Sequence, residues 1–193
     1  MEPRPGSPAR PPLAALLAGG ESRRFGAPKA LARVGGVRVV DRVLRALRET
    51  GAEVGVVGSR PEWLAELGLP VRPDVVAGAG ALGGVHAALR WAVEEGRPGA
   101  LCVACDMPFL PAGLLRRLLE RGAGTGADAV VPESTGRRGV EPLCAFYGAA
   151  CLGVAEAMLA GGERRMTGLL ERVRTVRLPL EEVREWGDPG TLF

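Results

Sequence analysis

Three residue types, isoleucine, asparagine and glutamine, are absent from this chain of 193 residues, and lysine and histidine occur once each. Depletion of thermolabile amides is typical of heat-stable proteins. The chain also lacks the roughly 18 consecutive apolar residues that a membrane-spanning helix needs. Its first twelve residues contain no apolar segment of the kind found in a signal peptide. We therefore expect a cytoplasmic protein that makes no contact with a membrane.

The excess of positive over negative charge is also small. Lysine and arginine together number 25 and aspartate and glutamate 22, which gives a net charge of +3, and the two signs are interspersed. No basic stripe for a polynucleotide is evident, so we expect no nucleic-acid partner. A local basic cluster would still attract a phosphorylated small molecule.

Cysteine is infrequent, and two of the four cysteines, Cys102 and Cys105, have the CxxC spacing of redox and zinc sites. They lie in an apolar run that is typical of a strand, where side chains three positions apart face opposite sides of a sheet. No second CxxC or histidine pair completes a zinc site. We therefore expect buried, reduced thiols.

What the chain does contain is a regular alternation of short apolar runs and helical patterns. This alternation predicts an α/β fold of three layers, with a mostly parallel sheet, helices on both faces and ligands beyond the carboxyl ends of the strands. We predict a disordered lead-in over residues 1–12 and one domain over residues 13–193. Strands are expected at 13–17, 53–57, near 72, and at 100–104, 127–131, 143–147 and 175–178, and helices at 39–47, 61–67, 85–95, 111–121, 149–159 and 167–173.

The single lysine, Lys29, lies at the end of a glycine-rich loop, whereas every other member of the 25 lysines and arginines is an arginine. A compact ammonium on a flexible stem can enter between phosphate oxygens where a planar guanidinium cannot. The retained lysine therefore indicates phosphoryl or nucleotidyl transfer.

The loop reads L-A-G-G-E-S-R-R-F-G-A-P-K and follows the first predicted strand directly. Its glycines allow backbone N–H groups to approach phosphate oxygens closely, and its polar side chains add donors. It matches neither GxxxxGK[ST] nor GxGxxG, which argues against a P-loop NTPase and a dinucleotide oxidoreductase. A turn with solvated arginines is the structural alternative. The nucleotide-binding candidates in the loop are Gly19, Gly20, Ser22, Arg23, Arg24 and Lys29.

A carboxylate, Asp106, follows the predicted strand at 100–104 in the sequence C-D-M-P. Magnesium prefers oxygen ligands and is commonly held by one or two carboxylates together with substrate phosphates. Asp106 is therefore the candidate metal ligand. Helix N-capping is its structural alternative, and the two roles can coexist.

A second carboxylate, Asp74, leads into a glycine-rich segment that ends at Gly84. A carboxylate acceptor suits a pocket for a base or a ribose. Guanine in particular carries N–H donors at N1 and N2 that a carboxylate can accept. An ordinary surface turn is the alternative.

These three segments, in this order, resemble the molybdenum cofactor guanylyltransferase family of the MobA type. Members carry an L-A-G-G-x-S-x-R-M-G-x-x-K loop, an aspartate followed by G-P-L-x-G, and a C-D-x-P strand end. The resemblance runs from about Leu13 to Arg174. It implies one Rossmann-like nucleotidyltransferase domain that transfers GMP from GTP to the phosphate of molybdopterin or molybdenum cofactor and releases pyrophosphate.

The resemblance also implies roles for particular residues. GTP would contact Leu17 to Gly19, Lys29, Asp74 and Asp106, with Asp106 on Mg²⁺ and Arg24 assisting at the phosphates. We therefore predict that Lys29, Arg24 and Asp106 are catalytic. Transient contact with cofactor-delivering proteins is also expected.

The chain departs from the family pattern at several points. Phe25, Pro28 and Ala81 replace residues usual in the family, and Glu141-Pro142 takes the place of a frequent His-Pro. The family usually carries a C-terminal N-x-N-T-P segment, which a chain without asparagine cannot contain. We expect that the C-terminal end of the domain is missing from this sequence.

Other functions remain open. A cytidylyltransferase acting on the same cofactor, a sugar-phosphate nucleotidyltransferase and a non-catalytic nucleotide-binding subunit share parts of this pattern. The L-A-G-G loop favours guanine over the L-A-A-G of cytidylyl enzymes, and retention of both Lys29 and Asp106 favours catalysis. We expect a structural role for His86, since direct phosphate attack needs no histidine. Arg137 and Arg138 either hold the phosphate of the pterin substrate or a partner, or are solvated.

Overall fold

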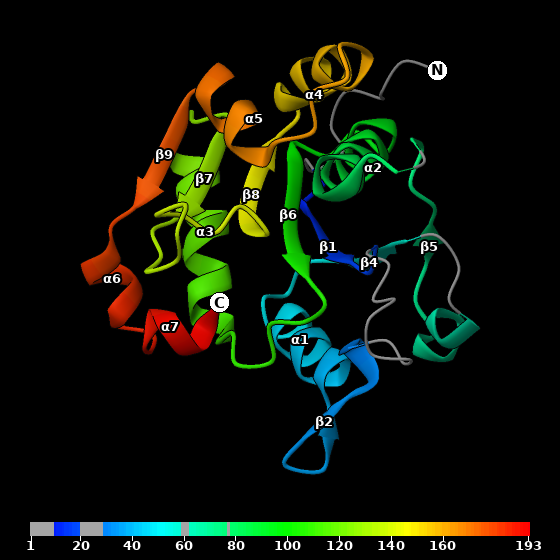
Figure 1. Cartoon of the computed structure of the whole chain (residues 1–193), viewed down its shortest axis with the longest axis vertical. Coiled ribbons are helices and arrows are strands. Elements are labelled where there is room, and N and C mark those ends of the chain that lie inside the picture. The colour runs from blue at the N-terminus through cyan, green and yellow to red at the C-terminus, as the bar shows by residue number, and fades with distance from the viewer. Residues whose placement is uncertain (1–9, 20–28, 59–61, 77) are drawn as a thin grey trace.

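The computed structural model describes residues 10–19, 29–58, 62–76 and 78–193. A central sheet is built from β1 (Leu13–Leu17), β4 (Val54–Val57), β5 (Val71–Arg72), β6 (Gly99–Ala104), β7 (Ala129–Pro132), β8 (Cys144–Gly148) and β9 (Thr175–Leu178). Its seven strands lie in the order β5-β4-β1-β6-β8-β7-β9 (Figure 1). Two further strands, β2 (Arg33–Val34) and β3 (Val37–Arg38), form a hairpin that projects from one end of the molecule.

The helices connect these strands and cover both faces of the sheet. They are α1 (Val39–Arg48), α2 (Gly80–Glu94), α3 (Ala112–Gly124), α4 (Cys151–Ala160), α5 (Met166–Arg172), α6 (Leu180–Arg184) and α7 (Pro189–Leu192), with 3₁₀ turns η1 (Lys29–Leu31) and η2 (Glu62–Leu67). Among the described residues, no helix combines the length and the apolar character needed to cross a membrane.

The sheet is mostly parallel, as predicted. β1 pairs in parallel with both β4 and β6, β4 pairs in parallel with β5, and β7 pairs in parallel with β9. Only β8 runs antiparallel to its neighbours, β6 and β7. The amino end of β8 therefore lies at the same edge of the sheet as the carboxyl ends of the other strands.

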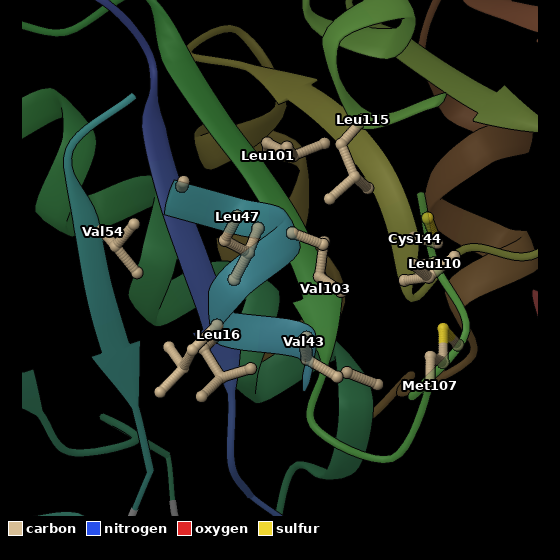
Figure 2. Packing of buried hydrophobic residues seen from close by; sticks show 14 of the residues in the cluster. Leu16, Val43, Leu47, Val54, Leu101, Val103, Met107, Leu110, Leu115 and Cys144 are labelled. Carbon is tan, nitrogen blue, oxygen red and sulfur yellow. The ribbon is translucent and has the colours of Figure 1, made fainter. Parts of the chain in front are cut away.

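The core consists of two apolar layers, one on each face of the sheet. Alternate residues of β1 divide between them, because successive side chains of a strand point to opposite faces. Leu16 packs with the buried faces of α1 and α3, whereas Leu13 and Leu17 pack with α2. Figure 2 shows Val43 and Leu47 of α1 next to Leu16 and Val103 of the sheet. The predicted arrangement of three layers is confirmed.

The predicted elements agree with the structure except at a few places. α2 begins at Gly80 rather than near Val85, so Gly83 and Gly84 belong to the helix and not to the preceding loop. A Cβ on Gly83 would lie 2.6 Å from Cβ of Ala79, which explains why glycine is needed in this first turn. The β2–β3 hairpin and the short helices α6 and α7 were not predicted, since elements of two to five residues give little periodic signal.

Residues 1–9 of the predicted lead-in lie outside the described residues. Within the remainder, the carbonyl oxygen of Pro11 accepts a hydrogen bond of 3.1 Å from the guanidinium of Arg97.

Candidate active site at the carboxyl edge of the sheet

The strand order reverses at β1, and this reversal locates the candidate site. The chain continues from β1 to β4 on one side, while β6 lies on the other. Open α/β sheets bind ligands in the crevice outside the carboxyl ends of strands at such a switch point. Cys105 donates its backbone N–H to the carbonyl of Leu17 at 3.1 Å, which joins the ends of β1 and β6. The residues that follow β1, up to Gly19, and those that follow β6, up to Asp106, therefore leave the sheet side by side.

Gly19 and Asp74 are in direct contact. A Cβ added to Gly19 would lie 3.0 Å from Oδ2 of Asp74, closer than nearly all real Cβ contacts. Asp74 reaches this position from the end of β5, which is two strands away from β1. The absence of a side chain at Gly19 thus makes room for the carboxylate, and both residues face the same space.

The carboxylate of Asp74 lacks a partner for one of its oxygens. Oδ1 is buried and accepts no hydrogen bond from the described residues. Burial raises the pKa of Asp74, because the charged form loses hydration that no nearby donor replaces. A buried acceptor without a donor is costly in the free protein, so it marks a place where a ligand can supply an N–H or O–H group.

Asp106 has a different environment. It is exposed directly beyond β6 and makes no hydrogen bond or ion pair with the described residues. The segment that carries it is anchored by Met107 and Leu110, which are 8% and 6% exposed and point into the core (Figure 2). α3 starts with Pro111 at its N-cap and has no side-chain cap, so the alternative of helix capping by Asp106 is wrong.

Lys29 is the first described residue after the glycine loop. It opens η1, in which the next residue, Ala30, is buried in the core with α1. The Lys29 side chain is exposed and forms an interaction within the protein. The predicted site residues Gly20, Ser22, Arg23 and Arg24 lie outside the described residues. The structure therefore brings together Leu17, Ala18, Gly19, Asp74 and Asp106 at one edge, with the loop ending at Lys29.

Glu141 is a polar residue at this edge that the sequence analysis did not include among the site residues. It lies three residues before the start of β8, and the carbonyl of Leu143 accepts a hydrogen bond of 2.8 Å from the N–H of Ala104 at the end of β6. Burial raises the pKa of Glu141; the backbone N–H of Leu143 and the guanidinium of Arg138 lower it, and the negative charge of Asp106 makes a smaller contribution that raises it. Only the antiparallel direction of β8 places Glu141 here, and no local pattern in the sequence reveals that direction.

The cysteines and the histidine take no part in this site. All four cysteines are free, and burial raises the pKa of the Cys105 thiol to about 11, which keeps it protonated and unreactive. No group of three or more metal-binding side chains occurs among the described residues. His86 is 3% exposed on α2, with its Nε2 atom 3.5 Å from a carboxylate oxygen of Glu156 on α4. A side chain buried between helices cannot reach a substrate, which supports a structural role for His86.

Carboxylates beyond the carboxyl ends of strands at the switch point of a mostly parallel sheet are typical of α/β proteins that bind nucleotides. The model of the MobA-like NTP transferase domain matches residues 14–176. The chain belongs to this family, as its sequence motifs predicted.

Individual relatives agree with this assignment. The chain is 38% identical to a probable molybdenum cofactor guanylyltransferase of Pelotomaculum thermopropionicum over 92% of this chain and 83% of that protein. It is 40% identical to a protein of the same description from Opitutus terrae, over 91% and 90% of the two chains. The crystal structure of molybdopterin-guanine dinucleotide biosynthesis protein A from Archaeoglobus fulgidus superimposes with a TM-score of 0.74 at 28% identity, covering 93% and 94%.

Proposed function

We propose that this protein transfers GMP from GTP to the terminal phosphate of molybdopterin, or of the metal-containing cofactor, and releases pyrophosphate. The relatives named above are molybdenum cofactor guanylyltransferases, which supports this reaction. The single structural observation that carries the proposal is the unpartnered carboxylate oxygen of Asp74, held against Gly19 at the same edge as Asp106. We place the reaction in the cytoplasm, with proteins that deliver molybdopterin as transient partners.

GTP is expected to bind over the carboxyl end of β1. The backbone N–H groups at Gly19 and Gly20 would approach the phosphates, because glycine offers no side chain to hinder them. The free oxygen of Asp74 would accept hydrogen bonds from the N1–H and N2–H₂ groups of guanine. This contact would supply the donor that the buried oxygen lacks in the free protein.

The cationic side chains of the loop are expected to neutralise charge on the phosphates. Lys29 would stabilise the α-phosphoryl oxygens, where negative charge grows during the reaction. Ser22, Arg23 and Arg24, with the loop amides, would hold the pyrophosphate as it leaves. These roles follow from the sequence of the loop.

Asp106 has the environment expected of a magnesium ligand. Its exposed carboxylate is an oxygen donor that no described protein group engages, beside a second carboxylate at Glu141. A site with few protein ligands is typical of Mg²⁺ held partly by substrate phosphates. Asp106 would hold this ion, which, when bound, would neutralise charge on the phosphates.

No covalent enzyme intermediate is needed. The acceptor phosphate is itself the nucleophile, and the chain contributes by aligning two anions and stabilising their charge. Consistent with this reaction, the raised pKa of Cys105 and the burial of His86 leave neither of them suited to act as a nucleophile or general base.

The test is a comparison of nucleotides and products. The protein is incubated with Mg²⁺, purified molybdopterin and each of GTP, CTP, ATP and UTP, and pyrophosphate and the dinucleotide product are quantified. The proposal expects a guanine dinucleotide with GTP alone. Turnover with CTP instead would identify a cytidylyltransferase, and binding without any product a non-catalytic subunit. A parallel incubation with a sugar phosphate in place of molybdopterin tests the acceptor, and turnover only in that incubation would identify a different acceptor class.

A further inference from the structure

Asp74 follows β5, the shortest strand of the seven-stranded sheet. β5 consists of Val71 and Arg72 and lies at the edge of the sheet beside β4 (Figure 1). Val71 is 40% exposed, so its side chain adds little apolar burial to hold the strand in place. Short edge segments with little burial open more readily than the core of a sheet. The position of Asp74 therefore depends on the other contacts of β5.

A single residue, Pro73, separates Arg72 from Asp74. The proline ring fixes its own φ angle and restricts the preceding residue to extended conformations. The chain between Arg72 and Asp74 can therefore bend little. Since Oδ1 of Asp74 accepts no hydrogen bond from the described residues, no such bond holds this oxygen in place. A movement of Arg72 would be passed on to the carboxylate.

The side chain of Arg72 connects β5 to α2. Its guanidinium lies over the ring of Trp91, 4.8 Å from the ring centroid, and it donates a hydrogen bond to the carboxylate of Glu94. A guanidinium between an aromatic face and a carboxylate is held by a cation–π contact and by a charge-assisted hydrogen bond. The side chain of Arg72 is partly buried, which reduces the screening of both contacts by water. Arg72 therefore fixes the edge strand to a helix of the core.

Trp91 is itself firmly held. Its indole is 4% exposed and donates the Nε1 hydrogen to a carboxylate oxygen of Glu95 at 2.6 Å. The ring packs directly on Gly55 of β4, where any Cβ would overlap it. Glycine at this position lets the indole lie against the strand next to β5. Arg72 thus stacks on a ring whose position the sheet and α2 both determine.

The backbone of Arg72 is linked to the candidate active site. Its carbonyl accepts the N–H of Gly58 at 2.9 Å. A Cβ on Gly58 would lie 3.2 Å from the carbonyl carbon of Ala18, so Gly58 packs closely on the chain that follows β1. Arg72 therefore lies between two parts of the site, the end of the β1 segment and Asp74.

We propose that Arg72 is a positioning residue for nucleotide selection: held by Trp91 and Glu94, it fixes β5 and so keeps the carboxylate of Asp74 against Gly19. Arg72 acts through Asp74 and makes no contact of its own with the base. This inference rests on the proposed function, because it takes Asp74 as the acceptor for the N–H groups of guanine.

Calorimetric titration with GTP and CTP tests the role of Arg72. Arg72→Ala is expected to lower the preference for GTP over CTP by about 3- to 10-fold, the effect of weakening hydrogen bonds between guanine and a displaced Asp74. CTP affinity should change less. Arg90→Ala is the matched control, because Arg90 also donates to Glu94, at 3.2 Å, but belongs to α2 and leaves the stacking of Arg72 on Trp91 in place. The control should keep the wild-type preference.

A double-mutant cycle distinguishes positioning from a general loss of stability. In the Asp74→Asn background, Arg72→Ala should change the remaining preference by less than about twofold, since the acceptor through which Arg72 acts is already altered. An equal loss in both backgrounds would show that Arg72 acts independently of Asp74 and would overturn the proposal.

Circular dichroism establishes whether each variant is folded. If Arg72→Ala is not, Arg72→Lys takes its place in the cycle, because lysine keeps the charge for Glu94 but has no planar group to stack on the indole. The same loss of preference is then expected at about two- to threefold, and again only when Asp74 is present.

The two proposals fail in different ways. If the wild-type protein binds GTP and CTP equally, the assignment of Asp74 to guanine is wrong and the role of Arg72 loses its basis. If the wild type prefers GTP and the folded Arg72 variant keeps that preference, the proposed function stands and the positioning role of Arg72 is refuted.

Discussion

The two halves of the sheet differ in construction and in the chemistry at their edges. The half formed by β5, β4, β1 and β6 is entirely parallel, and Gly19, Asp74 and Asp106 each lie two residues beyond the end of one of its strands. The half formed by β8, β7 and β9 contains the antiparallel strand and carries Glu141 and the two arginines of the 134–141 loop. Parallel strands place only the residues that follow them at this edge of the sheet. The antiparallel strand β8 adds residues that precede it, among them Glu141.

Because of this difference, we expect the two halves of the sheet to bind different anionic substrates. The parallel half offers close backbone approach and a carboxylate with a buried, unpartnered oxygen, which suits a nucleotide. The mixed half offers the exposed guanidinium groups of Arg137 and Arg138, of which Arg138 attracts the carboxylate of Glu141. Asp106 lies at the boundary, so it is the one residue whose loss should affect both substrates.

The largest effect is expected from Asp106→Ala. Removing the proposed cation ligand should lower kcat/KM by about 10³-fold or more at ordinary Mg²⁺ concentration, because a metal ion stabilises transition-state charge by several kcal/mol. Steady-state rates measure the loss, and circular dichroism confirms the fold. Glu171→Ala is the control, since Glu171 is an exposed carboxylate on α5. Near-normal turnover of the Asp106 variant would show that the cation is held elsewhere.

Lys29→Ala is expected to have the next largest effect. Loss of one preorganised cation should reduce kcat by about 10²–10³-fold. GTP affinity should change less, because the charge that Lys29 neutralises develops in the transition state. Calorimetry and single-turnover rates separate the two. Lys29→Arg should restore activity only in part; full activity of that variant would remove the significance of the single lysine.

The preference for GTP over CTP tests the proposed role of Asp74 in the parallel half, without involving the mixed half. GTP should bind at least about tenfold more tightly than CTP, a difference of roughly 1.4 kcal/mol. Asp74→Asn should reduce this preference, because the amide replaces one acceptor with a donor. The measurement is calorimetric titration of both proteins with both nucleotides in the absence of acceptor. Equal binding of CTP and GTP by the wild type would contradict the guanylyl assignment.

The smallest expected effect is a gain in stability for the same Asp74→Asn variant. Burial raises the pKa of Asp74, so between the ordinary and raised values the folded state binds more protons than the unfolded state. Stability therefore falls as pH rises through that window, and the deficit persists at pH 7. The variant should have a melting temperature about 1–3 °C higher at pH 7, with the difference disappearing near pH 4. An unchanged melting temperature at pH 7 would mean that the carboxylate is already solvated.

Much of the parallel half could be predicted from sequence. The strand at 13–17 and the helix at 39–47 agree closely with the structure, because each has a clear apolar pattern and ends near a glycine. Asp106 was predicted at a strand end for the same reason. The start of α2 was misplaced because its glycines indicate a loop by composition, whereas they lie within the helix and close packing against Ala79 requires a glycine at Gly83.

Local patterns and contiguous motifs were enough to predict the alternation of strands and helices, the family and the candidates Gly19, Lys29, Asp74 and Asp106. Only the three-dimensional arrangement shows that Asp74 lies against Gly19, that Asp106 does not cap α3 and that the residues before β8 lie beside the end of β6. These facts depend on the order and direction of strands far apart in the chain. Strand order is set by the packing of whole layers, and no single segment contains that information.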